Sequence, residues 1–142
     1  MQQNRNLSDL LEFISLIILN FPAVKERKVA NKNNTIEYIN QHYMEKISPK
    51  DIAKNFNISY SQLYKICKTN FMMSPKQIIT THRIRNAVDR LLMTDDSIKV
   101  IASKIGYTDE FLFSKTFSKA MGYSPSKFRN LDKATLSKLM FK

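Results

Sequence analysis

The sequence is poor in the residues that build disulfide, metal and phosphate-loop sites. Its 142 residues include one cysteine, two glycines, two histidines and no tryptophan. A single cysteine excludes a disulfide framework and a CxxC metal pattern, and it fits a reducing, cytoplasmic setting. Two isolated glycines exclude a Gly-rich phosphate cradle. With no nucleophile–base pair in the sequence either, we expect no enzyme activity, no metal and no cofactor.

Long apolar runs are also missing. The most apolar stretch, Leu7 to Phe21, is too short to cross a membrane and contains Asp9 and Glu12. It lacks the small-residue cleavage site of a signal peptide, so we expect neither export nor a membrane span. Its apolar residues recur at helical spacing and predict an amphipathic helix within an N-terminal segment, 1–21. This helix suits a homodimer interface and packing against the rest of the protein equally well.

Acidic residues are scarce relative to basic ones. Lysine and arginine total 23 against 12 aspartates and glutamates, which gives a net charge of +11. Such an excess indicates affinity for a polyanion, either a nucleic acid or an anionic membrane surface. A basic protein without such a partner is the alternative that charge alone leaves open.

Signals for β-structure are absent, and nearly the whole sequence predicts helices. A basic, Asn-rich stretch at 22–34 predicts a linker, and a second helix is expected to begin near Thr35. Helix caps and stops then predict the helices 49–56, 60–71, 75–93, 98–105 and 110–121. The start signals are Ser48, Ser59, Ser74, Ser97, Thr108 or Asp109, and Ser124. The stop signals, which tolerate the left-handed backbone that closes a helix, are Asn57, Gly106 and Gly122. Residues 132–142 are expected to form a C-terminal tail.

One sequence pattern occurs twice. The Ser-Pro pair at Pro75 returns at Pro125, 50 residues later (125 − 75). Each pair follows a small residue, a residue that tolerates positive φ and an apolar residue. These are Ala53, Asn57 and Leu63 in the first copy, and Ala102, Gly106 and Phe113 in the second. The small residue lets two helices cross closely, the second residue makes the tight turn, and the third packs back. The pattern therefore predicts two helix-turn-helix units joined by the long helix 75–93, although a generic helical bundle is the alternative.

Specific motifs fill both copies. In the second they are Ile101-Ala102, Gly106-Tyr107, Phe113-Ser114, Phe117, Lys119, Gly122, Ser124-Pro125 and Phe128-Arg129. In the first they are Ile52-Ala53, Ser59, Leu63, Ser74-Pro75, Arg83, Ala87 and Leu91-Leu92. In this order the motifs resemble the DNA-binding domain of AraC/XylS-type transcription regulators, over about 35–131.

Two positions depart from the pattern: Cys67 stands where an aromatic residue is usual, and Met72 where glycine is usual. Because Met incurs a steric cost at positive φ, we expect the first unit to be the less rigid one.

The resemblance implies an all-α, double helix-turn-helix domain that binds double-stranded DNA and regulates transcription, as an activator rather than a repressor. It also implies RNA polymerase as a partner. In that family a large N-terminal domain often senses a ligand or drives dimerisation, and the residues before Thr35 are too few for one. The joining helix would be roughly 28 Å long at ~1.5 Å per residue. Since successive major grooves lie ~34 Å apart, the two recognition helices are expected to enter adjacent grooves.

Helical spacing separates inward from outward residues on the two recognition helices. We expect Leu63, Ile66 and Cys67, and likewise Phe113, Thr116 and Phe117, to face inward. The candidate DNA contacts are Tyr60, Ser61, Tyr64, Lys65, Lys68, Glu110, Phe111, Ser114, Lys115, Ser118 and Lys119. Lys65 and Lys115 are expected to read base edges and Phe111 to touch a thymine methyl group. Lys68 and Lys119 are expected to contact phosphates. The competing interpretation is a basic helical module that binds anionic membranes or acidic proteins.

Overall fold

The computed structural model describes residues 30–140, and the regular secondary structure in this part of the chain is helix, without a strand. The N-terminal helix expected within 1–21, and a dimer built on it, lie outside the described residues. Between Ala30 and Met140, no helix is both long and apolar enough to span a bilayer. In chain order the helices are α2 (Ala30–His42), α3 (Pro49–Asn55), α4 (Tyr60–Phe71), α5 (Pro75–Met93), α6 (Ile98–Lys104), α7 (Glu110–Met121), α8 (Pro125–Arg129) and α9 (Lys133–Met140).

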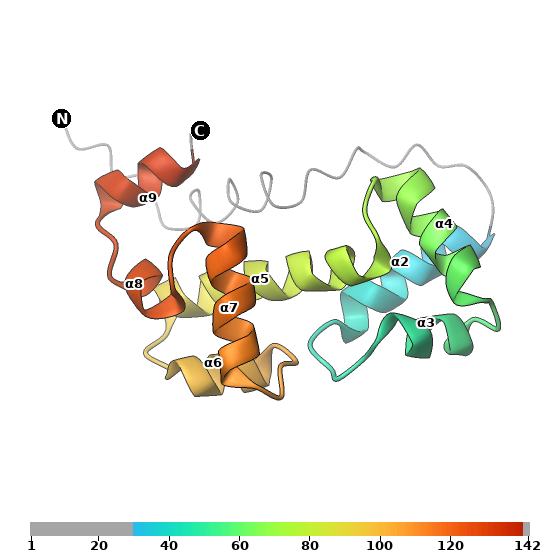
Figure 1. The fold of residues 1–142 in the computed structure, drawn as a ribbon, viewed down its shortest axis with the longest axis horizontal. Coiled ribbons are helices and arrows are strands. Elements are labelled where there is room, and N and C mark those ends of the chain that lie inside the picture. The colour runs from blue at the N-terminus through green and yellow to red at the C-terminus, as the bar shows by residue number, and fades with distance from the viewer. Residues whose placement is uncertain (1–29, 141–142) are drawn as a thin grey trace.

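The helices form two units that share α5, which runs through the middle of the molecule (Figure 1). The first unit comprises α2, α3, α4 and the start of α5; the second comprises the rest of α5 and α6 to α9. Within each unit a short helix packs against a longer one, α3 on α4 and α6 on α7. These pairs are the two expected helix-turn-helix motifs, so the all-α fold prediction is confirmed.

Side-chain caps set where the helices begin. Ser48, Ser59 and Ser74 each accept a hydrogen bond from a backbone N–H three residues later, and the side chains of Asp51, Gln62 and Gln77 accept from the cap's own N–H in return. This reciprocal capping box satisfies donors that the first helical turn would otherwise leave unpaired. The side chains of three further residues accept hydrogen bonds at helix starts: Ser97, Asp109 and Ser124.

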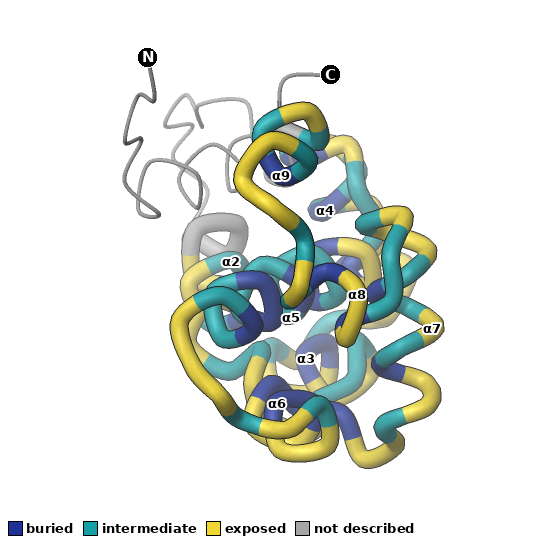
Figure 2. Tube along the Cα trace, turned by 90° about the vertical axis from the view of Figure 1, so that its left-hand side faces the viewer, coloured by how far each residue is buried: buried dark blue, intermediate teal, exposed yellow. Residues whose placement is uncertain are grey.

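Each unit has its own apolar core, and α5 contributes to both. Its first turns place Ile78 and Ile79 in the core of the first unit, and its later turns place Ile84, Val88 and Leu91 in that of the second. Figure 2 shows the buried residues concentrated where the helices meet around α5, and exposed ones along the outer side of α7. A continuous helix that is built into both cores fixes the spacing of the two units.

Two boundaries differ from the sequence expectation. Helix α2 begins at Ala30 rather than near Thr35, so the end of the expected linker 22–34 is helical. Residues 30–34 have no apolar stripe, but they extend a helix that Thr35 and Ile39 anchor in the core, and elongation costs far less than nucleation. The expected tail contains α9, which buries Leu136 in the second core and starts where the Asp132 side chain accepts from the N–H of Thr135 at 2.7 Å.

Candidate nucleic-acid interface

The two helix-turn-helix turns are built alike. Asn57 and Gly106 take positive φ values of 53° and 97°. In each turn the next N–H donates back into the first helix, from Ile58 to the Ala53 carbonyl at 3.0 Å and from Tyr107 to the Ala102 carbonyl at 2.9 Å. Both alanines are buried, so each second helix crosses closely over a small side chain. The second turn is one residue longer, because its helix is capped by Asp109 where the first is capped by Ser59.

The inner faces of α4 and α7 hold each recognition helix in place. Leu63 and Cys67 on α4, and Phe113 and Phe117 on α7, have no solvent exposure. Burial raises the pKa of the Cys67 thiol to about 11, which marks it as a structural apolar residue rather than a reactive one. Ile66 and Thr116, which we expected to face inward, are only half-buried. They lie on the flanks of their helices, since each follows a buried residue by three positions and is therefore roughly 60° around the helix from it.

The outer face of α4 presents the hydroxyl of Ser61 and the ammonium group of Lys65 to solvent. Tyr60 and Tyr64 lie beside them, with ring centroids 6.3 Å apart. Lys68 is half-buried, and its ammonium group lies 5.8 Å from the Tyr64 ring centroid. The aromatic ring therefore restrains Lys68, while Lys65 is free to reach outward.

The outer face of α7 is organised around Phe111, which is 83% exposed and occupies the position equivalent to Ser61. Lys115 and Lys119 follow it one and two turns later, and both are exposed. Exposing an entire phenyl ring to water is unfavourable, which makes Phe111 a candidate contact residue. Glu110, Ser114 and Ser118 are half-buried, and the Ser118 hydroxyl donates to the Ser114 carbonyl at 2.7 Å, which occupies its proton.

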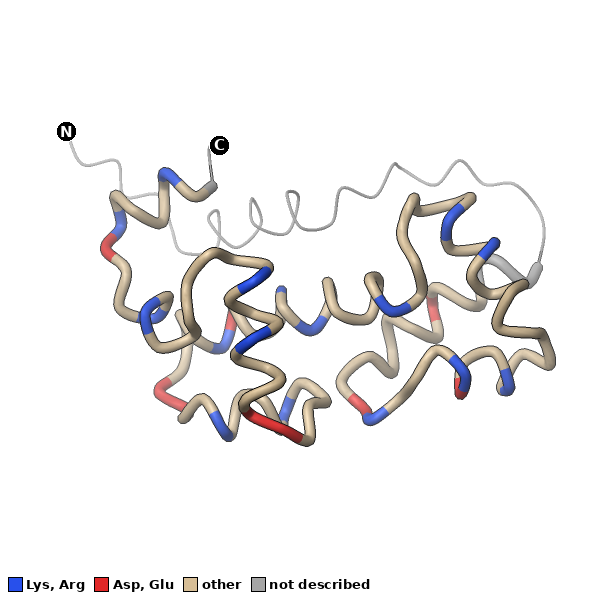
Figure 3. Tube along the Cα trace, viewed as in Figure 1, with Lys and Arg blue, Asp and Glu red and all other residues tan. Residues whose placement is uncertain are grey.

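Charges of opposite sign separate along the second recognition helix. The acidic residues Asp109 and Glu110 lie at its start, whereas Lys115 and Lys119 lie further along (Figure 3). The Asp109 carboxylate accepts from the N–H of Phe111 at 2.8 Å, so this charge caps the helix. The outer row of α4 carries Lys65 and no acidic residue. Thr69, which is equivalent to Lys119, and Leu112, beside Phe111, are also exposed and were not among the predicted contacts.

Arg83 on α5 joins the two units. Its Nε donates to the Tyr43 carbonyl at 2.7 Å and its Nη2 to the Glu45 carbonyl at 2.8 Å, so it fixes the chain that follows α2. Its guanidinium carbon also lies 5.3 Å from the Tyr107 ring centroid, in the turn of the second unit. Burial lowers the pKa of Arg83 and raises that of Tyr107, while each opposes the other's shift, as a cation near a phenol does.

Gly106 allows this junction to close. A Cβ atom at this position would lie 2.9 Å from the carbonyl oxygens of Met44 and Glu45, and 3.0 Å from Nε of Arg83. The second turn therefore presses its backbone against the loop of the first unit. The relative orientation of the two recognition helices depends on this contact as well as on α5.

Comparison with known proteins gives consistent matches over the double motif. Residues 52–131 match a family model described as a helix-turn-helix domain. The lactose operon transcription activator of Staphylococcus xylosus is 38% identical over 97 residues, which is 68% of this chain and 35% of that protein. The raffinose operon transcriptional regulatory protein RafR of Pediococcus pentosaceus is 33% identical over 106 residues, 75% of this chain and 38% of that protein. This chain thus spans little more than a third of these relatives.

A solved structure shares the fold. The C-terminal domain of AraT, a response regulator from Geobacillus stearothermophilus, superposes with a TM-score of 0.70 at 28% identity. The match covers 76% of this chain and 93% of that one. The double helix-turn-helix arrangement of this chain is therefore shared with the C-terminal domain of a response regulator.

Proposed function

Because the chain belongs to the AraC-type family of DNA-binding transcription regulators, we propose that it recognises a specific duplex sequence by placing α4 and α7 in two adjacent major grooves. The family is a class of DNA-binding domains and not of enzymes. The observation that carries the proposal is the equivalence of the two recognition helices. Ser61 and Lys65 on α4 match Phe111 and Lys115 on α7, and all four are exposed opposite a fully buried row.

Lys65 and Lys115 are the proposed base-reading residues. Both lie in the first half of their helix, the part that meets base edges in helix-turn-helix proteins, and a lysine donates well to the guanine O6 and N7 atoms. Phe111 is proposed to contact a thymine methyl group, and Tyr60, Ser61, Tyr64, Glu110 and Ser114 to line the same grooves. Lys68 and Lys119 are proposed to contact phosphates, which position the protein without reading sequence.

We further propose activation rather than repression, with RNA polymerase as a partner in the cytoplasm. Support for the sign comes from the name of the Staphylococcus xylosus relative, a transcription activator. A transcription assay with and without the protein, on the promoter next to its selected site, tests this part separately from DNA binding.

Selection from random duplex DNA tests the central proposal. We expect enrichment of a motif with two half-sites about one helical turn apart, because the rigid helix α5 joins the two units and fixes the spacing of their recognition helices. Affinity for the selected duplex is expected to fall steeply with salt, by ~0.9 in log K per log salt unit for each neutralised phosphate. Failure to enrich any motif, with equal binding to anionic lipid vesicles, would favour the basic interaction module instead.

Alanine variants test the assignment of roles. Lys65→Ala and Lys115→Ala should each weaken binding by about 1–3 kcal/mol and relax base preference only within their own half-site. Lys119→Ala is the matched control on α7: it should weaken binding to all sequences alike and lower the salt slope by about one unit. Uniform losses for Lys65→Ala and Lys115→Ala across single-base mutants of the selected site would instead make both lysines phosphate contacts.

A further inference from the structure

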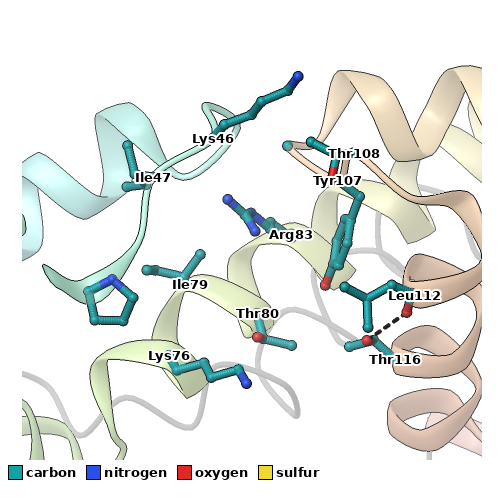
Figure 4. Close-up of a pocket in the computed structure, with 12 residues that line it drawn as sticks. Lys46, Ile47, Lys76, Ile79, Thr80, Arg83, Tyr107, Thr108, Leu112 and Thr116 are labelled. Atoms are coloured by element: carbon teal, nitrogen blue, oxygen red, sulfur yellow. Dashed lines mark hydrogen bonds between the residues drawn. The ribbon is translucent and has the colours of Figure 1, made fainter. Parts of the chain in front are cut away.

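A cleft of about 390 Å³ lies between the two units. Its floor is α5, one wall is the chain from Lys46 to Pro49 ahead of α3, and the other wall is the second turn together with one flank of α7 (Figure 4). The cleft is therefore lined by side chains from three separate segments, which together represent both helix-turn-helix units. Its polar lining residues include Lys46, Lys76, Thr80, Arg83, Thr108 and Thr116.

The charge of this cleft has one sign. Three of its lining residues are cationic and none is acidic. Lys46 and Lys76 are exposed, and neither forms an ion pair with any residue in the described part of the chain. Arg83 is held rigidly by its two carbonyl acceptors, so its charge is fixed at the floor. Glu45, which precedes Lys46 in the chain, contacts His42 at 2.7 Å.

The position of the cleft relates it to both recognition helices. Leu112 and Thr116 line it from the flank of α7, directly beside the outward row of Phe111 and Lys115. Lys76 lines it from the first turn of α5, which follows the end of α4. A DNA strand that passes from the groove read by α4 to the groove read by α7 must cross the space between these helices. A backbone phosphate there is an anion of the size and charge that two free ammonium groups and a fixed guanidinium accommodate.

We propose that this cleft binds the backbone phosphates of the DNA segment between the two half-sites, with Lys46 and Lys76 as the donors. The proposal rests on the proposed function and adds to it a third contact surface, which reads no base. It makes the separation of the half-sites part of recognition, because the phosphates meet the cleft only when both helices are seated at the right spacing. Arg83 supplies a fixed positive field there, while its N–H groups keep the first unit's loop in place.

The test compares two double variants that remove the same charge. Lys46→Ala/Lys76→Ala removes both free cations of the cleft; Lys133→Ala/Lys138→Ala removes two exposed lysines of α9 and serves as the control. Each is titrated with the selected duplex over a salt series. The cleft variant should bind about tenfold more weakly or worse, and its salt slope should fall by about 1.8 relative to the wild type. The α9 variant should retain the wild-type slope.

Uncharged phosphate analogues in the duplex show which DNA phosphates the cleft contacts. A duplex with methylphosphonates only between the half-sites should lose affinity for the wild-type protein and for the α9 variant, but not for the cleft variant. If the cleft variant and the α9 variant behave alike on both duplexes, the phosphate site is overturned while the proposed function stands. If the wild type enriches and binds no specific duplex, both are overturned.

A further experiment asks whether the cleft binds free phosphate instead of DNA, because the same cations suit a small anion. Inorganic phosphate is titrated into the DNA-free protein while the Lys46 and Lys76 side chains are observed by NMR. Saturable binding of free phosphate, together with full DNA affinity in the cleft variant, would overturn the backbone assignment. Little binding of free phosphate, with the DNA effects above, supports it.

Discussion

The two helix-turn-helix units follow the same backbone plan, but different side chains fill and close them. In the second unit Phe113, Phe117 and Phe128 pack ring against ring, with centroids 5.8 and 5.3 Å apart along the series. In the first unit Cys67 takes the place of Phe117, with a much smaller side chain. The recognition helices also end differently, at Met72 with φ 57° and at Gly122 with φ 79°. Caps and turns therefore define the shared backbone, whereas from the difference in core volume and helix closure we expect the second unit to be the more stable one.

Arginines show a second difference between the units. Arg129 on α8 donates to the carbonyls of Leu91, Thr94 and Asp96, and so fastens the chain ahead of α6 within the second unit. Arg83 fastens the chain ahead of α3 in the same manner, but it also lies against Tyr107 in the other unit. The unit with Cys67 in its core is thus the one whose arginine also contacts the other unit. This arrangement lets the second unit position the first.

The largest expected effect compares the two equivalent core positions. Phe117→Ala should lower the free energy of unfolding by about 3–5 kcal/mol, because it leaves a cavity among fully buried rings. Cys67→Ala removes only one buried sulfur atom and should cost about 1 kcal/mol. Denaturant unfolding of both variants measures the difference. Equal losses at the two positions would break the claim that the aromatic core makes the second unit more stable.

The next largest effect isolates the contact between units. Gly106→Ala should cost about 3 kcal/mol or more, since the new Cβ atom meets two backbone carbonyls and the residue keeps a positive φ. Gly122→Ala is the matched control, because its φ is also positive but no atom beyond its chain neighbours lies within 4 Å of the new Cβ. It should cost only about 1–2 kcal/mol. Similar losses would show that backbone strain alone, and not the close approach of the units, explains the Gly106 effect.

Acid should destabilise the protein through the first unit. Burial, with a smaller contribution from Arg85, lowers the pKa of His82 from 6.5 to about 4, and its ring stacks on Tyr43 at 5.2 Å. The unfolded chain therefore takes up a proton near pH 6.5 that the folded chain refuses until about pH 4. The contribution of neutral His82 to the free energy of unfolding is therefore complete above pH 6.5. It is lost as the pH falls from 6.5 toward 4, and it amounts to about 2 kcal/mol because the ring is partly exposed.

His82→Gln is the control for that titration. Denaturant unfolding at several pH values should show a flatter pH dependence between 6.5 and 4 in the variant than in the wild type. In the second unit, the hydrogen bond from Lys104 lowers the pKa of the Asp96 carboxyl below 3.8. Protonation of Asp96 therefore destabilises the protein at pH values below the range in which His82 acts. An unchanged slope in His82→Gln would assign the acid sensitivity to other groups.

Local sequence signals account for most of the fold. Capping residues such as Ser59 and Ser74 interact within one turn, so they predict helix starts without knowledge of tertiary contacts, and the predicted helices agree with the structure to within one residue at either end. The exceptions, α9 and the start of α2, depend on packing against distant residues. In retrospect, Asp132 ahead of apolar residues at helical spacing, Leu136 and Leu139, predicts α9.

The candidate site was only partly readable for the same reason. Helical periodicity identifies the outward rows of α4 and α7, because each row belongs to a single helix. The cleft, in contrast, assembles Lys46, Lys76 and Thr116 from three separate segments, and the closeness of Gly106 to the first unit depends on how both units pack on α5. Such long-range arrangements leave no periodic signal in the sequence.

The smallest expected effect tests helix closure at Met72. This residue takes a left-handed conformation that costs a residue with a Cβ atom about 1–2 kcal/mol, and its side chain is 78% exposed, so its loss removes little burial. Met72→Gly relieves that strain, but glycine also frees the unfolded chain, which costs about 0.4–1 kcal/mol. The net gain should be about 0.5–1 kcal/mol in the free energy of unfolding. Met72→Ala keeps the Cβ atom and should give no gain. If alanine stabilises the protein as much as glycine does, the exposed methionine side chain and not the left-handed backbone is the unfavourable feature, and closure of the recognition helix no longer distinguishes the two units.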